Sequence, residues 1–353
     1  MAATQNLHVR SFEKLRPATE LLKEIPASPE ISKLVSESRA TIARILSGED
    51  PRFMVISGPC SIHDEKAAFE YAERFAALSK EIDDKIYPVM RVYFEKPRTT
   101  VGWKGLINDP HMDGSYDINT GLEKARRILL KILEMGLPTA TEFLDPFVPQ
   151  YTGDLVCWAA IGARTTESQT HREMASGLSM PVGFKNNTDG NTQVALEAVE
   201  SAAHPHNFLG VDENGAVSVV RTTGNPHCHI ILRGGRSKPN YDEASVAEVM
   251  KAMEKSGSRN RIIVDCSHAN SGKQHGKQEI ALQEIVAQRR SGNDQLVGIM
   301  LESHLFEGNQ KIPDDLKDLK YGVSVTDACI DFPTTERLLR DAHANLSPVA
   351  AGV

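Results

Sequence analysis

The sequence has no surplus of positive charge, and it has no long apolar run. Lysine and arginine total 40 against 47 aspartates and glutamates, which gives a formal net charge of −7 over 353 residues. A protein that grips DNA or RNA through a broad basic face is therefore not expected. No run approaches the ~18 apolar residues that a membrane-spanning helix needs, and the first residues have no apolar core of the signal-peptide type. We expect neither a nucleic acid nor a membrane as a partner.

Cysteine is also scarce. The five cysteines are too few, and odd in number, for a disulfide scaffold in a chain of this length; they are Cys60, Cys157, Cys228, Cys266 and Cys329. This pattern favours a reducing, cytoplasmic location. Hydrophobic residues make up 40% of the chain and charged residues 25%, a balance typical of a folded soluble protein rather than a disordered one.

Eight short apolar runs alternate with longer segments of helical periodicity. Runs that are apolar on both faces fit the strands of a parallel sheet whose crossovers are helices. The predicted strands are Phe53–Ser57, Tyr87–Phe94, Thr139–Leu144, Cys157–Gly162, Pro181–Lys185, His229–Arg233, Arg261–Cys266 and Leu296–Leu301. Amphipathic helices are predicted over Asp64–Ser79, Gly121–Met135, Tyr241–Ser256, Gln278–Arg290 and Thr334–Asn345.

Eight such units predict an α/β fold of the (β/α)₈ TIM-barrel class. The alternative is an open doubly wound sheet, which the lack of a G-x-G-x-x-G motif after any strand disfavours. The barrel would span residues 51–345, between a charged, partly helical N-terminal extension at 1–50 and a short tail at 346–353. Residues 207–223 carry β-branched stretches on either side of Asn214-Gly215, which predicts a β-hairpin inserted between the fifth helix and the sixth strand. Neither the N-terminal extension nor the hairpin is needed to close a barrel. We therefore expect both segments to serve assembly or regulation.

A polar or ionisable residue stands at each of the eight strand ends, where such barrels place their chemistry. These residues are Cys60, Arg91, Glu142, Arg164, Lys185, Arg233, His268 and Glu302. Four of them are cations, and Lys96 and Arg98 in the loop after the second strand add two more. A single arginine is most simply a surface salt bridge. Six cations at one mouth repel each other, so we expect a ligand with several phosphate or carboxylate charges.

A second group of residues has the chemistry of a mixed metal site. Cys60, His268, Glu302 and Asp327 combine sulfur, nitrogen and oxygen donors, which suits a divalent first-row metal without strong selectivity. The four are scattered along the chain, and no compact ligand motif joins them. Ordinary core packing of the cysteine and hydrogen bonding of the histidine remain the alternative.

Six longer motifs are distinctive enough to compare with known families. They are GPCSIHD at 58–64, RVYFEKPRTTVGWKG at 91–105, GARTTES at 162–168, PVGFKN at 181–186, LRGG at 232–235 and DCSH at 265–268. These motifs resemble those of the 3-deoxy-D-arabino-heptulosonate 7-phosphate (DAHP) synthases of the short, type I-alpha form, and the resemblance covers roughly residues 7–345. That family condenses phosphoenolpyruvate with D-erythrose 4-phosphate and water, releasing phosphate, in the first step of the shikimate pathway to the aromatic amino acids.

The resemblance implies roles for the residues at the mouth. It implies that Cys60, His268, Glu302 and Asp327 hold a divalent ion such as manganese, iron or cobalt. For the substrates it implies Arg91 and Lys185 at the phosphoenolpyruvate carboxylate, Arg164 and Arg233 at its phosphate, and Arg98 and Thr99 at the erythrose phosphate. Lys96 would lie between the two substrates and Glu142 near the attacking water. The catalytic set is then Lys96, Cys60, His268 and Glu142.

The family is commonly inhibited by an aromatic amino acid and assembles as a homodimer or homotetramer. The resemblance places the inhibitor among Pro149, Gln150, Leu178, Ser179, Phe208, Gly210 and Val220, next to the N-terminal segment of a neighbouring subunit. Relatives that respond to phenylalanine tend to have serine at the position of Gly210, and those that respond to tyrosine have glycine. We therefore expect tyrosine, with phenylalanine as the alternative; Gly210 also simply suits the hairpin backbone.

Two rival functions compete with this reading. A related synthase that uses arabinose 5-phosphate is shorter and lacks the KPRTTVGWKG run present at 96–105. An inactive barrel that only senses aromatic amino acids would have lost cations or metal ligands, and none is missing here. The chain departs from the family's usual pattern at Asn187, where glycine is common, and by one additional residue in the run 234–239.

Overall fold

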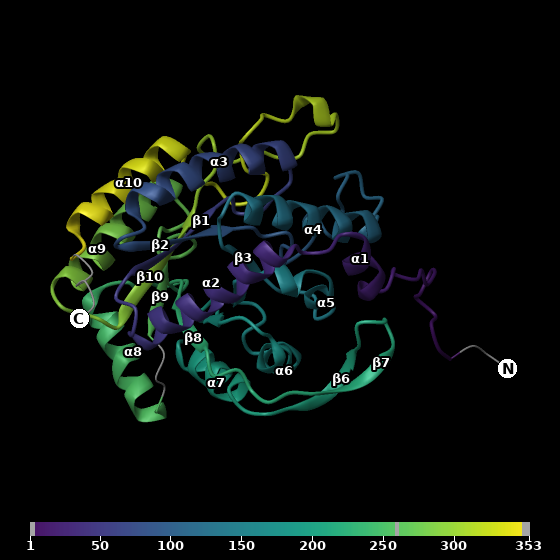
Figure 1. Ribbon diagram of the computed structural model, residues 1–353, viewed down its shortest axis with the longest axis horizontal. Helices are drawn as coiled ribbons and strands as arrows, with labels where there is room; N and C mark the ends of the chain where they lie inside the picture. Colours follow the sequence, from purple (N-terminus) through teal and green to yellow (C-terminus); the bar gives the residue numbers. More distant parts are fainter. Residues whose placement is uncertain (1–3, 258–260, 348–353) are drawn as a thin grey trace.

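The computed structural model describes residues 4–257 and 261–347 (Figure 1). Eight parallel strands close a barrel in the order β1-β10-β9-β8-β5-β4-β3-β2. The strands are β1 Phe53–Gly58, β2 Ile86–Arg91, β3 Thr139–Glu142, β4 Trp158–Ile161, β5 Val182–Lys185, β8 Cys228–Leu232, β9 Ile262–Asp265 and β10 Leu296–Glu302. All eight predicted strands are present, and the (β/α)₈ barrel is confirmed. Residues 1–3 of the predicted extension and 348–353 of the predicted tail lie outside the described residues.

Helices follow the strands and cover the outside of the barrel. They are α3 Glu65–Ile82, α4 Ile118–Glu134, α5 Val148–Thr152, α6 Gln169–Gly177, α7 Gln193–Ala202, α8 Glu243–Ser256, α9 Gln278–Arg290 and α10 Phe332–Asn345. Asp64 begins α3 by accepting hydrogen bonds from the backbone N–H groups of Lys66 and Ala67. Gly257, with a φ of 70°, ends α8 in the left-handed conformation that glycine adopts without strain. The five predicted amphipathic helices are confirmed with small shifts of their ends.

The second predicted strand is too long, because β2 ends at Arg91 rather than Phe94. Val92, Tyr93 and Phe94 are nevertheless buried. Their backbone makes isolated hydrogen bonds, from Val92 N–H to the Ala140 carbonyl and from Ile62 N–H to the Tyr93 carbonyl. An apolar run therefore marks burial here, while regular pairing stops at the cavity that opens above the strands.

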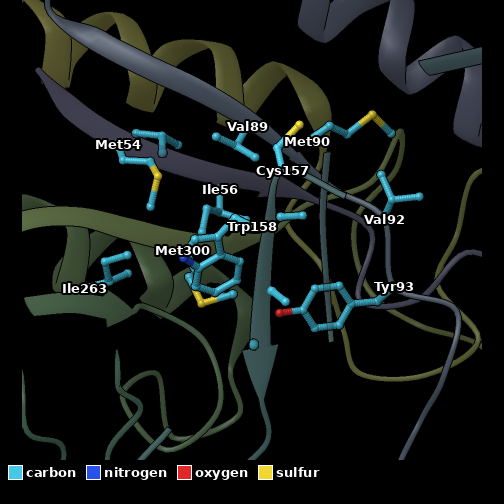
Figure 2. Packing of buried hydrophobic residues seen from close by; sticks show 14 of the residues in the cluster. Met54, Ile56, Val89, Met90, Val92, Tyr93, Cys157, Trp158, Ile263 and Met300 are labelled. Carbon is cyan, nitrogen blue, oxygen red and sulfur yellow. The ribbon is translucent and has the colours of Figure 1, made fainter. Parts of the chain in front are cut away.

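The interior of the barrel is filled by side chains from opposite strands. Figure 2 shows the Trp158 indole among Ile56 and Met300. The indole Nε1 donates a hydrogen bond to Nε2 of His229, 3.1 Å away. Burial lowers the pKa of His229 to about 4, so this histidine is a neutral acceptor inside the core.

The N-terminal extension forms two helices, α1 Ala18–Glu24 and α2 Pro29–Ser47. Ile42, Ile45 and Leu46 on α2 are fully buried in the same apolar cluster as the barrel. The N–H of Arg261 donates to the carbonyl of Leu46, just before β9 begins. Arg39 donates to the carbonyl of Val156, just before β4. Helix α2 therefore packs against the N-terminal ends of the strands.

The predicted hairpin is confirmed as β6 Asn207–Val211 paired antiparallel with β7 Val217–Arg221, between α7 and β8. It extends away from the barrel at the lower right of Figure 1. Its tip contacts the extension, because the N–H of Thr19 donates to the carbonyl of Glu213 at 3.0 Å. No helix among the described residues is long and apolar enough to cross a membrane.

Candidate active site

A cavity of about 800 Å³ opens at the C-terminal ends of the barrel strands, and we call it the mouth cavity. The barrel topology gathers here side chains that are up to 236 positions apart in the sequence. Ten of the predicted residues line it: Arg91, Lys96, Arg98, Thr99, Glu142, Arg164, Lys185, Arg233, His268 and Asp327. Cys60 and Glu302 are buried, and their contacts with Lys96 and Arg91 connect them to the lining.

Three of the four predicted metal ligands form one tight cluster. A ligand atom from each of Cys60, Glu302 and Asp327 lies within 4.8 Å of the others. His268 is nearby but outside that cluster, with Nε2 3.8 Å from Oε1 of Glu302. Burial raises the pKa of the Cys60 thiol to about 11, and the ammonium of Lys96 lies 3.1 Å from its sulfur. One thiol, two carboxylates and an adjacent imidazole fit a divalent first-row metal, which would deprotonate the thiol on binding.

Asp265 lies behind His268, and no role was predicted for it from the sequence. Its Oδ2 lies 3.0 Å from Nδ1 of His268, whose Nδ1 is also 2.7 Å from the Ser267 hydroxyl. Burial opposes ionisation of Asp265, but the neighbouring His268 and Lys185, with the Ser267 hydroxyl, outweigh it and hold its pKa well below the usual range. His268 itself has a φ of +54°, an uncommon conformation for a residue with a side chain. A carboxylate behind the ring leaves Nε2 for a metal.

The deep cations of the mouth cavity have partners within the protein. Arg91 is 1% exposed, and its Nη2 lies 3.1 Å from Oε1 of Glu302. Its guanidinium also stacks 3.6 Å from the ring centre of Tyr93, while its Nη1 has no hydrogen-bond partner among the described residues. Lys185 lies 3.0 Å from Asp265 and 3.8 Å from Glu142. These pairs make the burial of the charges tolerable, and the unpartnered Nη1 is a donor that a ligand can use.

The rim of the mouth cavity is formed by exposed cations on separate loops. Arg164 donates from Nε to the Thr99 hydroxyl at 3.1 Å, which joins the loops after β4 and β2. Arg236 and Lys273 line the same cavity and were missed from the sequence. Lys273 follows a tight turn, with φ of +60° and its N–H donating to the carbonyl of His268.

Glu95 is a second buried carboxyl that the sequence analysis did not single out. Its oxygens accept hydrogen bonds from the N–H groups of Leu144 and Asp145, in the loop after β3. Burial raises its pKa to about 8 despite these bonds. Glu95 precedes Lys96 in the chain, so it ties the segment that carries Lys96 to a neighbouring loop.

The predicted inhibitor residues lie around the hairpin. Phe208 and Val220 are opposite each other on one face of it, and a Cβ added to Gly210 would lie 2.7 Å from Cγ2 of Val220. Gln150, on α5 with Pro149, donates from Nε2 to the carbonyl of Val211 at 3.2 Å. Leu178 and Ser179 follow α6, whose Ser176 hydroxyl lies 2.7 Å from that of Thr222 at the base of the hairpin. The geometry brings Gln150 and the end of α6 to the hairpin.

A family model described as the DAHP synthetase I family matches residues 25–340. The chain belongs to this family. It is 54% identical over 345 residues to the Tyr-sensitive phospho-2-dehydro-3-deoxyheptonate aldolase of Escherichia coli K12, covering 98% of this chain and 97% of the relative. It is 52% identical over 335 residues to the Phe-sensitive enzyme of the same organism, covering 95% of each.

A solved structure gives the same result in three dimensions. The phospho-2-dehydro-3-deoxyheptonate aldolase of Francisella tularensis SCHU S4 superposes with a TM-score of 0.93 at 47% identity, covering 96% of this chain and 98% of that one. The family expected from the motifs and the barrel expected from the apolar runs are therefore both confirmed.

Proposed function

We propose that the protein is a DAHP synthase, a transferase that condenses phosphoenolpyruvate with D-erythrose 4-phosphate and water to give DAHP and phosphate. The observation that carries this proposal is the mouth cavity itself. Cations line it from the motif runs at 91–105, 162–168, 181–186 and 232–235, and Asp327, which clusters with Cys60 and Glu302, lines it as well. Two multiply anionic substrates require such a surplus of positive charge.

Arg91 and Lys185 would bind the carboxylate of phosphoenolpyruvate, and Arg164 and Arg233 its phosphate. The supporting geometry is that Arg91 and Lys185 are almost fully buried and Arg233 is 9% exposed, whereas Arg164 lies at the rim. Arg98 and Thr99 would bind the phosphate of erythrose 4-phosphate, next to the Arg164–Thr99 hydrogen bond. Holding two like-charged substrates face to face is a large part of the catalytic task.

In the proposed reaction, C3 of phosphoenolpyruvate forms a bond to the aldehyde carbon of erythrose 4-phosphate. Lys96 is held protonated by Cys60, Glu302 and Asp327, which raise its pKa against the effect of burial, and it donates a proton to the aldehyde oxygen. Water adds to C2 beside Glu142, which accepts a proton from it. The bond between C2 and the phosphate oxygen then breaks, the new C2 hydroxyl gives its proton to the departing phosphate, and C2 becomes a carbonyl carbon.

We infer that Cys60, His268, Glu302 and Asp327 hold a divalent ion, with manganese, iron and cobalt as the candidates. Such an ion supplies Lewis-acid polarisation of the aldehyde oxygen. The supporting observation is the donor set, in which Oδ2 of Asp265 lies 3.0 Å from Nδ1 of His268, on the side of the ring away from Nε2. Metal analysis of the dialysed protein should give about one ion per chain, and Asp265→Asn should lower the measured affinity for Mn²⁺ about 10–100-fold.

The test of the reaction is an assay of phosphoenolpyruvate consumption and phosphate release with each aldose phosphate. We expect turnover with erythrose 4-phosphate and little with arabinose 5-phosphate. Preference for arabinose 5-phosphate would favour the sister synthase. The absence of turnover with either, in protein with intact metal content, would favour the inactive sensor.

We further propose that tyrosine inhibits the enzyme at the hairpin, with Phe208, Gly210 and Val220 on its binding face. Gly210 lies on the same face as Phe208 and Val220, and a Cβ added there would lie 2.7 Å from Cγ2 of Val220, so a larger residue would displace Val220 and narrow this face. Inhibition should be strongest with tyrosine among the three aromatic amino acids, and Gly210→Ser should weaken it. Selective inhibition of the unaltered protein by phenylalanine would overturn this assignment.

We also infer a homodimer or homotetramer that forms through the extension at 1–50 and the hairpin at 207–223, which is inserted in the catalytic barrel of residues 51–345 but is not needed to close it. Leu209 and Val217 on one face of the hairpin are 81% and 82% exposed, and Phe12 of the extension is 80% exposed. Exposed apolar patches of this kind mark interaction surfaces. Sedimentation of the full chain would give the assembly state. The scarcity of cysteine supports a cytoplasmic location, and the described residues, which include all five cysteines, contain no disulfide.

A further inference from the structure

Two loops meet along one side of the mouth cavity, the loop at 186–192 after β5 and the loop at 233–241 after β8. A Cβ added to Gly235 would lie 2.5 Å from the Cα of Gly190, so the two backbones are in direct contact. Asn186 joins them further, because its Nδ2 donates to the Gly234 carbonyl and its Oδ1 accepts from the Arg233 N–H. Both departures from the family pattern, Asn187 and the additional residue, fall in this pair of loops.

Arg236 is held loosely at the edge of these loops. Its side chain is 80% exposed and lines the mouth cavity, and its Nε lies 3.1 Å from Oδ1 of Asp189. Asp189 is itself 66% exposed, and an ion pair between two such side chains contributes little to stability. No residue in the described part of the chain accepts a hydrogen bond from the Nη groups of Arg236. Those groups are free to bind a second anion.

The cations deep in the mouth cavity are paired with carboxylates, whereas most of those at its rim are not. The deep cations Arg91 and Lys185 pair with the buried carboxylates Glu302 and Asp265. At the rim, by contrast, Arg98, Arg164 and Lys273 form no ion pair with any described residue, and Arg236 has only Asp189. The rim therefore carries positive charge that the protein itself leaves largely unneutralised. An anionic group of a substrate would neutralise this charge on binding.

We propose that Arg236 is a further substrate-binding residue, whose guanidinium exchanges the Asp189 carboxylate for a phosphate group of a substrate. This inference rests on the proposed function, because both substrates of that reaction carry a phosphate. Guanidinium donates two parallel hydrogen bonds to phosphate, whereas the pair with Asp189 has its Nε 3.1 Å from Oδ1 without the geometry of a hydrogen bond. A dianion therefore gains more from Arg236 than the exposed carboxylate does. Until a phosphate binds, Asp189 orients the Arg236 side chain.

The test compares Arg236→Gln with Asp189→Asn in the full-length protein, by measuring kcat and KM for each substrate separately. Arg236→Gln should raise KM for one of the two substrates about tenfold, the size expected for losing a charge-assisted hydrogen bond. Asp189→Asn should lower that same KM or leave it unchanged, because it removes the competing anion. The substrate whose KM rises identifies which phosphate is bound.

Lys238→Gln is the matched control, because it removes a cation from the same loop outside the lining of the mouth cavity. It should leave both KM values unchanged. Arg236→Lys, which keeps the charge without the paired donors, should fall between the unaltered protein and Arg236→Gln.

Three results would overturn the proposal. The first is an equal increase in KM from Arg236→Gln and from Asp189→Asn, and the second is an equal increase in KM for both substrates in Arg236→Gln. The third is no increase in KM from Arg236→Gln. The first would make the pair a structural link between the loops, and the second would reflect only the loss of overall positive charge. Turnover by the unaltered protein separates these outcomes from a failure of the proposed function.

Discussion

The two ends of the barrel are built from different interactions. At the N-terminal end of the strands, α2 packs the fully buried Ile42, Ile45 and Leu46 against the barrel. At the C-terminal end, the buried groups are charged, as in the pairs of Arg91 with Glu302 and of Lys185 with Asp265. The apolar end contributes stability through burial, whereas the charged end needs a partner for every buried ion.

Backbone strain and an unpartnered hydrogen-bond donor are found at the charged end of the barrel. His268 and Lys273, both at the charged end, have positive φ angles, and the buried Nη1 of Arg91 lacks a partner among the described residues. Such features lower stability, and an anionic ligand that accepts a hydrogen bond from Nη1 of Arg91 would offset part of that cost. Substitutions at the two ends should therefore separate stability from activity.

The largest effect is expected from Lys185→Met, which leaves the buried Asp265 carboxylate without its ammonium partner. Breaking a buried pair from one side costs about 3–5 kcal/mol. Urea unfolding of the variant measures this loss. In the double variant Lys185→Met/Asp265→Asn most of the lost stability should return, whereas equal destabilisation of the single and double variants would contradict the pairing.

Ile45→Ala tests the other end of the barrel. Deleting this buried side chain should reduce the free energy of unfolding by about 2–5 kcal/mol. The variant should keep kcat and KM at temperatures where it is folded, since α2 packs at the end away from the mouth cavity. Exposed Lys33→Ala on the same helix is the control, expected within about 0.5 kcal/mol of the unaltered protein. A large fall in kcat of folded Ile45→Ala would show that the ends are coupled.

Cys60→Ala should reduce activity strongly and change the free energy of unfolding little. We expect kcat/KM to fall more than about a hundredfold, because even changes behind the ligands of a metal site cost 10–100-fold. That factor corresponds to at least about 2.7 kcal/mol. Cys157→Ala, in the core of the barrel, should lose stability but keep activity and metal. Full activity of Cys60→Ala, with metal bound, would rule out the sulfur as a ligand.

Glu95→Gln should change the pH dependence of stability. The folded-state pKa of Glu95 is raised from 4.5 to about 8 by burial, so the folded protein retains a proton that the unfolded chain has lost. Between about pH 4.5 and 8, this group therefore lowers the free energy of unfolding by ~1.4 kcal/mol per pH unit as pH rises. The profile of the variant should be flatter across that range. Parallel profiles for the two proteins, or a flattening equal to that of exposed Glu134→Gln, would contradict the assignment.

The apolar runs were enough to predict the barrel, since both faces of each strand are buried and the strand ends carry the functional groups. Arg91, Glu142, Lys185 and Glu302 were predicted to lie at the C-terminal ends of strands, and each is the last residue of its strand in the structure. Asp265 also ends a strand, yet its role depends on the reversed turn at His268, which no residue pattern reveals. Arg236, Lys273 and Glu95 were missed for a similar reason, because their place follows from loop conformations and from contacts between loops distant in sequence.

The central claim is that activity at the mouth cavity depends on a metal ion, whereas the stability of the barrel does not. Removal of metal from the full-length protein tests this claim most directly. Phosphoenolpyruvate consumption with erythrose 4-phosphate and thermal unfolding are followed on the same sample after treatment with a chelator. We expect turnover to be lost while the barrel stays folded, and to return when Mn²⁺ or Co²⁺ is added. Undiminished turnover in protein whose metal content has been measured as zero would contradict the assignment of Cys60, His268, Glu302 and Asp327.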